Sequence, residues 1–251
     1  MVQIASTLLV TGASRGIGAA TALLAASRGF DVAVNYTHNA EAARAVATQV
    51  QALGQRAICC QADVADEAAV LAMFARIDAE LPPLKGLVNN AGIVGMKSRL
   101  DEMDSARWRR MLEVNVFGSL LCAQHALRRM STKHGGTGGA IVNLSSVAAT
   151  LGAPAMYIDY AASKGAIDSF TIGLARELAG EGIRVNAVRP GIIDTDIHAD
   201  SGDPGRAQAS SSIIPMKRPG RADEVAAAII WLLSEEASYT TGSIVEVTGG
   251  R

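Results

Sequence analysis

The sequence has 251 residues, 49% of them apolar, and a formal net charge of −1 at pH 7. This length suits one large α/β domain or two small ones, and the apolar content allows a sizeable core. The balanced charge, without acidic or basic blocks, argues against nucleic acid or an anionic membrane surface as a partner. Residues Met1–Thr11 lack the basic start and long apolar run of a signal peptide, and no stretch is long enough to predict a membrane span.

The three cysteines predict no cross-link. They are odd in number, two of them (Cys59 and Cys60) are adjacent, and none lies in a C-x-x-C pair. This pattern argues against a disulfide framework or a zinc site and predicts buried, reduced thiols in a cytoplasmic protein. The four histidines also lack ligand spacing, so no metal site is expected.

The chain begins with the elements of a phosphate-binding unit. Thr7–Thr11 is a short apolar run that predicts a strand buried on both faces. Ala19–Arg28 is rich in alanine and leucine and predicts a helix that stops before Gly29. A strand, a glycine-rich turn and a helix together form the context in which such a turn binds phosphate.

The glycine-rich turn between these elements, Gly12–Gly18, reads GASRGIG. Gly12 permits a tight turn, Gly16 lets the backbone approach a pyrophosphate, and Gly18 allows the helix to pack closely on the strand. The helix that follows directs its N-terminus at the anion. The spacing is G-x-x-x-G-x-G rather than the commoner G-x-G-x-x-G, and the competing interpretation is a tight turn without a ligand.

The second predicted strand, Asp31–Tyr36, lacks an acidic residue where dinucleotide-binding folds use one to bind the ribose 2′-hydroxyl. That position, at the carboxyl end of the strand, holds Asn35, whereas Asp31 lies at the opposite end. Asn35 carries no charge that would repel a 2′-phosphate. Arg15 in the glycine-rich turn can attract one, unless it is simply a solvated loop arginine. The combination favours NADP over NAD.

Asp63 follows the third predicted strand, Ala57–Gln61, which comes after a predicted helix at Ala40–Leu53. An aspartate in this place can cap the next helix, Asp66–Glu80. It can also accept a hydrogen bond from an adenine amino group. The two roles are compatible, and the sequence does not choose between them.

Two later segments place asparagines in unusual positions. The predicted strand Leu84–Asn89 runs into the tetrapeptide NNAG, whose small and amide residues suit a backbone that passes close to a flat cofactor. An ordinary turn has the same composition. Asp104–Met130 has a long helical pattern with Asn115 in its interior, where asparagine is unfavourable because its side chain competes for backbone hydrogen bonds. A solvent-facing or capping side chain is the alternative there.

The fifth predicted strand, Ala140–Leu144, ends at two serines, and the next helix starts at or near Asp159. This helix carries Tyr160 and Lys164, whose spacing of four places an ammonium beside a phenol on one helix face. A free phenol has a pKa of about 10, too high for a base at neutral pH, and a nearby cation lowers it. Such pairs are common by chance, so the surrounding residues decide whether this pair is catalytic.

The last part of the chain predicts a strand at Arg184–Val188, an irregular stretch at Ile192–Pro219, a helix at Ala222–Leu233 and a strand at Ile244–Val247. A long irregular stretch inside a compact domain is typical of a functional lid, here taken as residues 192–217 with His198 in it. Strands alternate with helices throughout. This pattern predicts a single-domain α/β Rossmann fold, a doubly wound and mainly parallel seven-stranded sheet with helices on both faces.

These motifs together resemble the short-chain dehydrogenase/reductase family over essentially the whole chain. The variant DYAASKGAID resembles a bacterial subgroup labelled glucose-dehydrogenase-like or oxoacyl-reductase-like. The residues that carry the resemblance are TGASRGIG (Thr11–Gly18), Asp63, NNAG (Asn89–Gly92), Asn115, Ser145 and Ser146, YAASK (Tyr160–Lys164), RPG (Arg189–Gly191) and VTGG (Val247–Gly250).

The resemblance implies an NADP(H)-dependent oxidoreductase that interconverts a carbonyl and a secondary alcohol. Tyr160 would be the general acid/base, and Lys164 would lower its pKa and bond the nicotinamide ribose. Ser146 would donate to the substrate oxygen where charge develops. Asn115 would hold a water that relays protons from Lys164. The hydride itself would be carried by the nicotinamide.

The resemblance also implies a cofactor site and a homotetramer. Thr195 would bond the nicotinamide carboxamide, and Ile193 would line the same edge through its backbone. NADP(H), preferred over NAD(H), would lie against Gly12, Ser14, Arg15, Gly16, Ile17, Gly18, Asn35, Tyr36, Asp63, Val64, Asn90, Ala91, Gly92, Tyr160, Lys164, Pro190, Gly191, Ile193 and Thr195. The partner would be a small carbonyl or alcohol substrate.

Two features near the tyrosine need interpretation. Ser146 lies 14 residues before Tyr160, one more than the family usually shows, and Ser145 lies 15 before it. Ser146 is the preferred donor, with the extra residue expected to bulge the loop around residues 153–157. Tyr157 lies near the same site, but the residue four positions later is Ala161, so it lacks a lysine partner and is expected to line the substrate pocket.

Two other functions compete with this interpretation. A dinucleotide-binding sensor without turnover typically loses the tyrosine or the lysine, and this chain has both. Epimerases or dehydratases of nucleotide sugars are longer and carry a C-terminal substrate domain, whereas only 60 residues follow Gly191. The identity of the substrate does not follow from the sequence.

Overall fold

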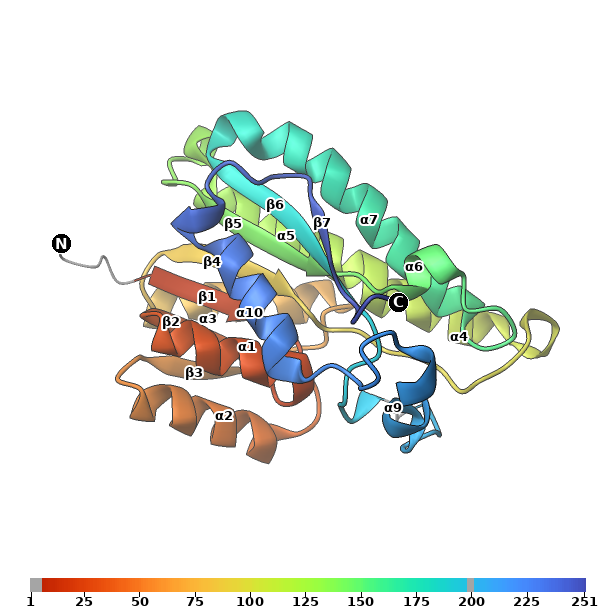
Figure 1. Ribbon diagram of the computed structural model, residues 1–251. Helices are drawn as coiled ribbons and strands as arrows, with labels where there is room; N and C mark the ends of the chain where they lie inside the picture. The colour runs from red at the N-terminus through yellow and green to blue at the C-terminus, as the bar shows by residue number, and fades with distance from the viewer. Residues whose placement is uncertain (1–5, 198–200) are drawn as a thin grey trace.

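The computed structural model describes residues 6–197 and 201–251. Within these ranges seven strands form one fully parallel sheet in the order β3-β2-β1-β4-β5-β6-β7 (Figure 1). The order reverses beside β1, so the carboxyl ends of β1 and β4 open onto a common crevice. The strands are β1 (Ser6–Val10), β2 (Phe30–Tyr36), β3 (Ala57–Gln61), β4 (Leu84–Asn89), β5 (Gly139–Leu144), β6 (Ile183–Pro190) and β7 (Ile244–Val247).

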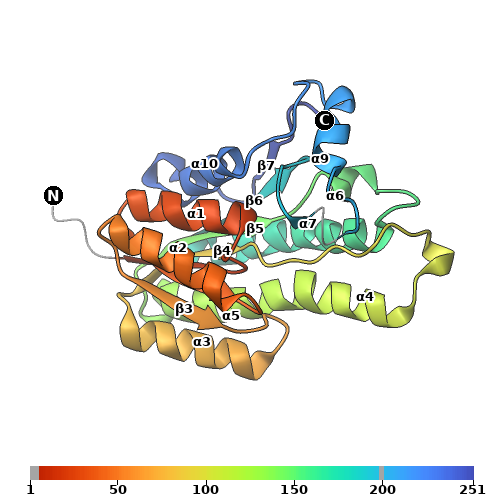
Figure 2. The same ribbon diagram turned by 90° about the horizontal axis from the view of Figure 1, so that it is seen from below.

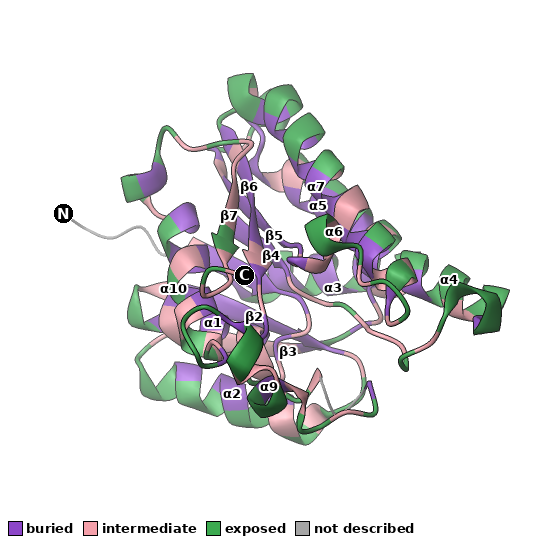
Figure 3. Cartoon of the chain, turned by 45° about the vertical axis from the view of Figure 1, so that its right-hand side comes forward, coloured by how far each residue is buried: buried purple, intermediate pink, exposed green. Residues whose placement is uncertain are grey.

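Helices cover both faces of the sheet. One face is covered by α1 (Gly16–Ser27), α2 (Ala40–Ala52) and α10 (Ala222–Leu233), as Figure 2 shows. The other face is covered by α3 (Glu67–Glu80), α5 (Gly118–Met130) and α7 (Ile158–Leu178). Each face has its own apolar cluster, and the buried residues fill the sheet and the inner sides of the helices (Figure 3). The expected doubly wound Rossmann fold is confirmed, with a sheet that is parallel throughout.

Local chemistry explains where the elements begin and end. Leu8, Leu9 and Val10 in β1 are fully buried, since helices lie on both faces, and this is why the strand is a continuous apolar run. The side chain of Asn39 caps α2 by accepting from the Ala42 amide at 2.9 Å. Asp66 caps α3 in the same way.

The predicted helix at 104–130 is interrupted. It consists of α4 (Ser105–Leu112), a π-helical segment (Glu113–Phe117) and α5. Asn115 lies in the π-helical segment and is buried, so neither a solvent-facing nor a helix-capping role applies. Such π segments occur within α-helices frequently at functional sites.

The irregular stretch that was expected to form a lid is ordered over its described residues and contains α9 (Arg206–Ala209). The two ends of this stretch are joined by backbone hydrogen bonds. The Gly220 amide donates to the Ile192 carbonyl, and the Asp194 amide donates to the Gly220 carbonyl. Ile192, Ala207 and Ile214 form a small apolar cluster within it. His198, expected in this lid, lies outside the described residues. Among the residues described, no helix is both long and apolar enough to cross a bilayer.

Candidate active site

Two cavities adjoin at the carboxyl edge of the sheet. We call the first the tyrosine cavity; its volume is about 440 Å³, and Ser146, Tyr157, Tyr160 and Lys164 are among its lining residues. We call the second the glycine groove; its volume is about 460 Å³, and the turn from Gly12 to Ile17 lies along it. The cavities form one cleft, because they share Ile17, Asn90, Gly92, Thr195 and Ile197.

The glycine-rich turn has the geometry of a cradle for an anion. Gly12 and Gly16 have φ angles of 62° and 57°, which favour glycine. A Cβ on Gly18 would lie only 2.4 Å from the Gly12 carbonyl oxygen, so this glycine permits the close packing of α1. No side chain caps α1, whose first amides therefore face the groove and are available to a phosphate. The turn fits the pyrophosphate of a dinucleotide.

Most residues that were expected to contact the cofactor line this cleft. They are Gly12, Ser14, Arg15, Gly16, Ile17, Tyr36, Asp63, Val64, Asn90, Ala91, Gly92, Tyr160, Lys164, Pro190, Gly191, Ile193 and Thr195. Gly18 and Asn35 do not line it. The groove adds residues that the sequence interpretation missed, above all Thr37, His38 and Asn39, which follow β2.

The prediction that Asn35 contacts the cofactor is wrong. It is 1% exposed, and its side chain faces the protein interior rather than the groove. Its Oδ1 accepts from the Gly12 amide at 3.1 Å, and its Nδ2 donates to the carbonyls of Cys60 and Ala62 at 3.2 and 3.0 Å. Asn35 therefore holds the glycine-rich turn in place and cannot meet a ribose. Successive side chains of a strand point to opposite faces, and the neighbouring Tyr36 is the one that lines the groove.

The substitution Asn35→Asp tests this placement. An aspartate would lose both donated hydrogen bonds and hold a buried carboxylate against two carbonyl oxygens, so we expect the free energy of unfolding to fall by about 3 kcal/mol or more. Urea unfolding measures the change. Asn39→Asp is the matched control, because aspartate caps a helix as well as asparagine does. Unchanged stability with a switch of cofactor preference would restore the first interpretation.

Asp63 is held at the rim of the groove by two partners. Its Oδ1 accepts from the Ala65 amide at 3.0 Å and its Oδ2 accepts from Arg110 at 2.6 Å. Burial raises the pKa of this carboxyl, but these hydrogen bonds outweigh it and hold the pKa below its usual value. Asp63 does not cap α3, since Asp66 does, and the adenine role stays a prediction.

Asn115 joins the π-helical segment to the loop that follows β4 at the cleft. Its Oδ1 accepts from the Ile93 amide at 2.8 Å, and its Nδ2 donates to the Ile93 carbonyl at 3.0 Å and to Ser163 Oγ at 3.1 Å. A Cβ on Gly92 would lie 3.3 Å from Asn115 Oδ1 and 3.6 Å from Lys164 Nζ. Asn115 therefore positions the backbone between the two cavities, and its relay of protons through a water stays a prediction.

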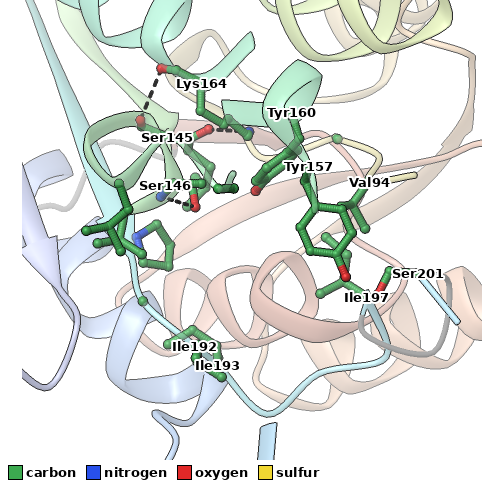
Figure 4. Close-up of a pocket in the computed structure, with 18 of the residues that line it drawn as sticks. Val94, Ser145, Ser146, Tyr157, Tyr160, Lys164, Ile192, Ile193, Ile197 and Ser201 are labelled. Carbon is green, nitrogen blue, oxygen red and sulfur yellow. Dashed lines mark hydrogen bonds between the residues drawn. The ribbon is translucent and has the colours of Figure 1, made fainter. Parts of the chain in front are cut away.

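The two serines after β5 have different surroundings. Ser145 is buried, and its hydroxyl donates to the Lys164 carbonyl at 3.3 Å. Ser146 is more exposed to the cavity, and its Oγ accepts from the Ala148 amide at 3.1 Å (Figure 4). Its hydroxyl also interacts with Tyr160 and lowers the pKa of that phenol. This arrangement favours Ser146 as the group that meets a substrate oxygen beside Tyr160.

Lys164 and Tyr160 lie together on α7, as the spacing predicts. Lys164 Nζ donates to the Leu144 carbonyl at 2.6 Å and lies 5.7 Å from the centre of the Tyr160 ring. Burial lowers the pKa of the Lys164 ammonium to about 8, with the Asp168 carboxylate acting in the opposite direction. The lysine therefore loses much of its charge in mildly alkaline solution.

The expected effect of Lys164 on Tyr160 is not found. Packing around the phenol raises the pKa of Tyr160, and the contributions that lower it come from the Ser146 hydrogen bond and the positive charge of Arg206. The physical reason lies in the geometry, since the Lys164 ammonium is directed at a backbone carbonyl. The raised pKa keeps Tyr160 protonated at neutral pH.

The loop between Ser146 and Tyr160, where the extra residue was expected to form a bulge, is irregular. It contains a single turn, α6 (Ala148–Leu151), followed by Ala153 and Ala155 at φ angles of 44° and 55°. Alanine in this left-handed region costs on the order of 1 kcal/mol each. The loop brings Tyr157 into the tyrosine cavity, where it was expected to lie.

The sequence interpretation also missed two cationic residues, Arg206 of α9 and Arg251, which line the tyrosine cavity. The guanidinium of Arg206 lies 4.8 Å above the centre of the Tyr157 ring. The signal available in the sequence was a basic residue within the predicted lid. Nothing in the sequence near Arg251 indicates that it reaches the same cavity.

Comparison with known proteins agrees with this geometry. A family model described as enoyl-(acyl carrier protein) reductase matches residues 12–251. The chain belongs to the short-chain dehydrogenase/reductase family. It is therefore an NAD(P)-dependent oxidoreductase, the enzyme class that the motifs predict.

Individual relatives extend over nearly the whole chain. An uncharacterized oxidoreductase, YgfF of Escherichia coli strain K12, is 54% identical over 97% of this chain and 98% of its own. The cis-4-hydroxycyclohexanecarboxylate dehydrogenase of Sinomonas cyclohexanicum is 43% identical over 96% of this chain and 94% of its own. A short-chain dehydrogenase from Burkholderia cenocepacia, solved in complex with NADP, superposes with a TM-score of 0.88 at 39% identity and covers 98% of this chain and 97% of its own.

Proposed function

We propose that the protein interconverts a carbonyl compound and a secondary alcohol with NADP(H), using Tyr160 as the general acid/base. The observation that carries the proposal is the meeting of Ser146, Tyr160 and Lys164 where the tyrosine cavity joins the glycine groove. This junction is where a nicotinamide would lie if its pyrophosphate occupied the glycine-rich turn. The apolar lining of the tyrosine cavity, which includes Val94, Val147 and Ile192, excludes water from the reacting atoms.

Each residue has a chemical task in this proposal. The bound nicotinamide would supply or accept the hydride. Ser146 donates a hydrogen bond to the substrate oxygen as negative charge develops there. Tyr160, a phenol that is protonated at neutral pH, gives its proton to that oxygen during carbonyl reduction. Lys164 holds the first turns of α7 against the end of β5 through the Leu144 carbonyl, and Asn115 fixes the backbone beside it.

We also infer a preference for NADP(H) over NAD(H). Two observations support it: Arg15 lines the glycine groove, and no acidic residue lies at the described end of β2 from Asn35 to Asn39. The Burkholderia cenocepacia relative was solved with NADP. Asn35 no longer contributes to this preference, because it faces the interior.

Arg15→Ala tests the preference. Loss of a charge-assisted hydrogen bond to the 2′-phosphate is expected to raise the Kd for NADPH about tenfold and to change the Kd for NADH less than about twofold. Fluorescence titration measures both constants. Arg176→Ala, at an exposed position of α7 far along the helix from Tyr160, serves as the control. Equal affinities for the two cofactors, or an unchanged preference in the variant, would count against the assignment.

A carbonyl panel assayed with NADPH tests the proposed reaction. The relative from Sinomonas cyclohexanicum is named for a cyclic hydroxy acid, so 4-oxocyclohexanecarboxylate belongs in the panel beside aliphatic ketones, keto esters and sugars. We expect oxidation of NADPH with at least one of these compounds. Tight NADPH binding without any turnover across the panel would instead favour a dinucleotide-binding sensor.

We further infer that the chain is a single domain that assembles as a homo-oligomer, with the tetramer as the expected form. Trp108, Leu112, Phe117 and Leu120 expose apolar side chains along α4, the π-helical segment and α5, and a patch of this kind is suited to a second copy. Sedimentation as a monomer at micromolar concentration would contradict the inference. The unpaired thiols of Cys59, Cys60 and Cys122 suit a reducing compartment such as the cytoplasm.

A further inference from the structure

The charged side chains that line the tyrosine cavity are all cationic. Among the described residues they are Lys164, Arg206 and Arg251, and no aspartate or glutamate lines this cavity. The rest of the lining is largely apolar. Three cationic side chains favour an anion in this cavity, and apolar walls strengthen their field.

The two arginines differ from others near the site. Arg107 is paired with Asp159 at 2.7 Å, and Arg189 is paired with Asp168 at 2.8 Å. Neither Arg206 nor Arg251 forms an ion pair with any carboxylate in the described part of the chain. Arg206 instead stacks on the Tyr157 ring.

Arg251 is held near the cavity by the segment that carries Arg206. The Met216 amide donates to the Gly249 carbonyl at 3.1 Å, and a Cβ on Gly250 would lie 3.1 Å from the Pro215 side chain. Burial, and then the charge of Arg206, lower the pKa of Arg251. The two guanidinium groups therefore repel each other, and an anion between them would relieve this repulsion.

Tyr157 provides an independent observation. Its side chain is 3% exposed, and its hydroxyl is buried without a hydrogen-bond partner among the described residues. Figure 4 shows this hydroxyl pointing toward Ile197 and Ser201, which also line the cavity. A buried hydroxyl left unpaired costs free energy that a bound acceptor would recover.

We infer that the tyrosine cavity selects substrates that carry a carboxylate, with Arg206 and Arg251 binding the anion and the Tyr157 hydroxyl donating to it. The inference rests on the proposed function, because it names the substrate class of the same site. Tyr157 is the N-cap of α7, three residues before Tyr160, and both side chains line the tyrosine cavity. A substrate of this kind would hold its carboxylate and its reacting carbonyl in the same cavity, with the carbon atoms between them against the apolar wall.

Matched acid and ester substrates test the inference. The probes are 4-oxocyclohexanecarboxylate and 4-oxopentanoate, each with its methyl ester, which removes the charge and keeps the carbonyl. For the wild-type protein we expect kcat/KM to be at least roughly tenfold higher for each acid than for its ester. In Arg206→Met we expect kcat/KM for the acids to fall roughly 10- to 100-fold and the preference for acids to disappear.

Three further variants sharpen the test. Arg206→Lys keeps the charge and should restore part of the preference for acids, which a merely structural role for Arg206 would not predict. Arg251→Met should weaken the same preference, and the double variant should abolish it. Arg176→Met is the control for loss of a surface guanidinium. The thermal unfolding temperature of each variant reports whether it is folded.

Binding is measured separately by calorimetry, with 4-oxocyclohexanecarboxylate titrated into the protein saturated with NADP⁺, which cannot reduce the ketone. Binding that is lost in Arg206→Met supports the inference even if no acid or ester is reduced, in which case the proposed reaction alone fails. Esters reduced as well as acids by the wild-type protein would overturn the inference and leave the proposed reaction intact. Absence of acid binding to the wild-type protein would also overturn it.

Discussion

Tyr160→Phe is expected to lower kcat by roughly 10³-fold, because the substitution removes the only proton that Tyr160 can exchange with the substrate oxygen. The ring remains, so the packing at the start of α7 should be preserved. NADPH affinity should therefore change by less than about threefold, since the glycine-rich turn and α1 carry most of the binding. Steady-state kinetics and fluorescence titration of the same preparation measure the two effects.

A matched control separates the chemistry from the loss of any tyrosine hydroxyl. Tyr239 is fully exposed, and Tyr239→Phe should leave both kcat and the NADPH affinity unchanged. If Tyr160→Phe retained wild-type turnover on the same substrate, Tyr160 would not be the acid/base. Proton transfer would then have to come from another group at the cavity, of which Ser146 is the nearest candidate.

Lys164→Met is expected to change how stability depends on pH. The folded pKa of Lys164 is about 8, whereas the unfolded lysine keeps the ordinary value of 10.5. Between these values the unfolded chain binds one more proton than the folded chain, so wild-type stability rises with pH there. The rise is about 1.4 kcal/mol per pH unit, and the variant lacks this contribution.

The measurement is urea unfolding of both proteins, without nucleotide, from pH 7 to about pH 9, where a free tyrosine is still about nine-tenths protonated. The free energy of unfolding of the wild type relative to the variant should be flat below about pH 8 and rise above it. Lys133→Met, which removes a largely exposed lysine, is the control variant. Parallel curves for the wild type and Lys164→Met would show that Lys164 titrates normally.

The sequence predicted the sheet well, for a physical reason. The bounds predicted for β3, β4, α10 and β7 agree with the structure to the residue. Strands covered by helices on both faces become short apolar runs, and turn residues mark their ends. The π-helical segment at 113–117 was missed, because apolar periodicity continues through it and only the buried Asn115 indicates a departure.

The sequence predicted which residues gather at the candidate site, but not where each of their side chains points. The unusual residues at the ends of β1, β4, β5 and β6 do meet at one edge, since parallel strands bring their carboxyl ends together. Successive side chains of β2 point to opposite faces of the sheet. A shift of one residue in the predicted pattern therefore turns Asn35 from the groove to the interior. Arg206 and Arg251 reach the cavity through contacts between the 192–217 segment and the last residues, which no local pattern encodes.

The most direct test of the proposed reaction follows the hydride itself. The protein is incubated with NADPH that carries deuterium at both C4 positions of the nicotinamide and with a carbonyl compound that it reduces, and the alcohol is examined by mass spectrometry. We predict one deuterium on the carbinol carbon of the wild-type product and almost none in the same time with Tyr160→Phe. An alcohol without deuterium, or equal transfer by the two proteins, would contradict hydride transfer assisted by Tyr160.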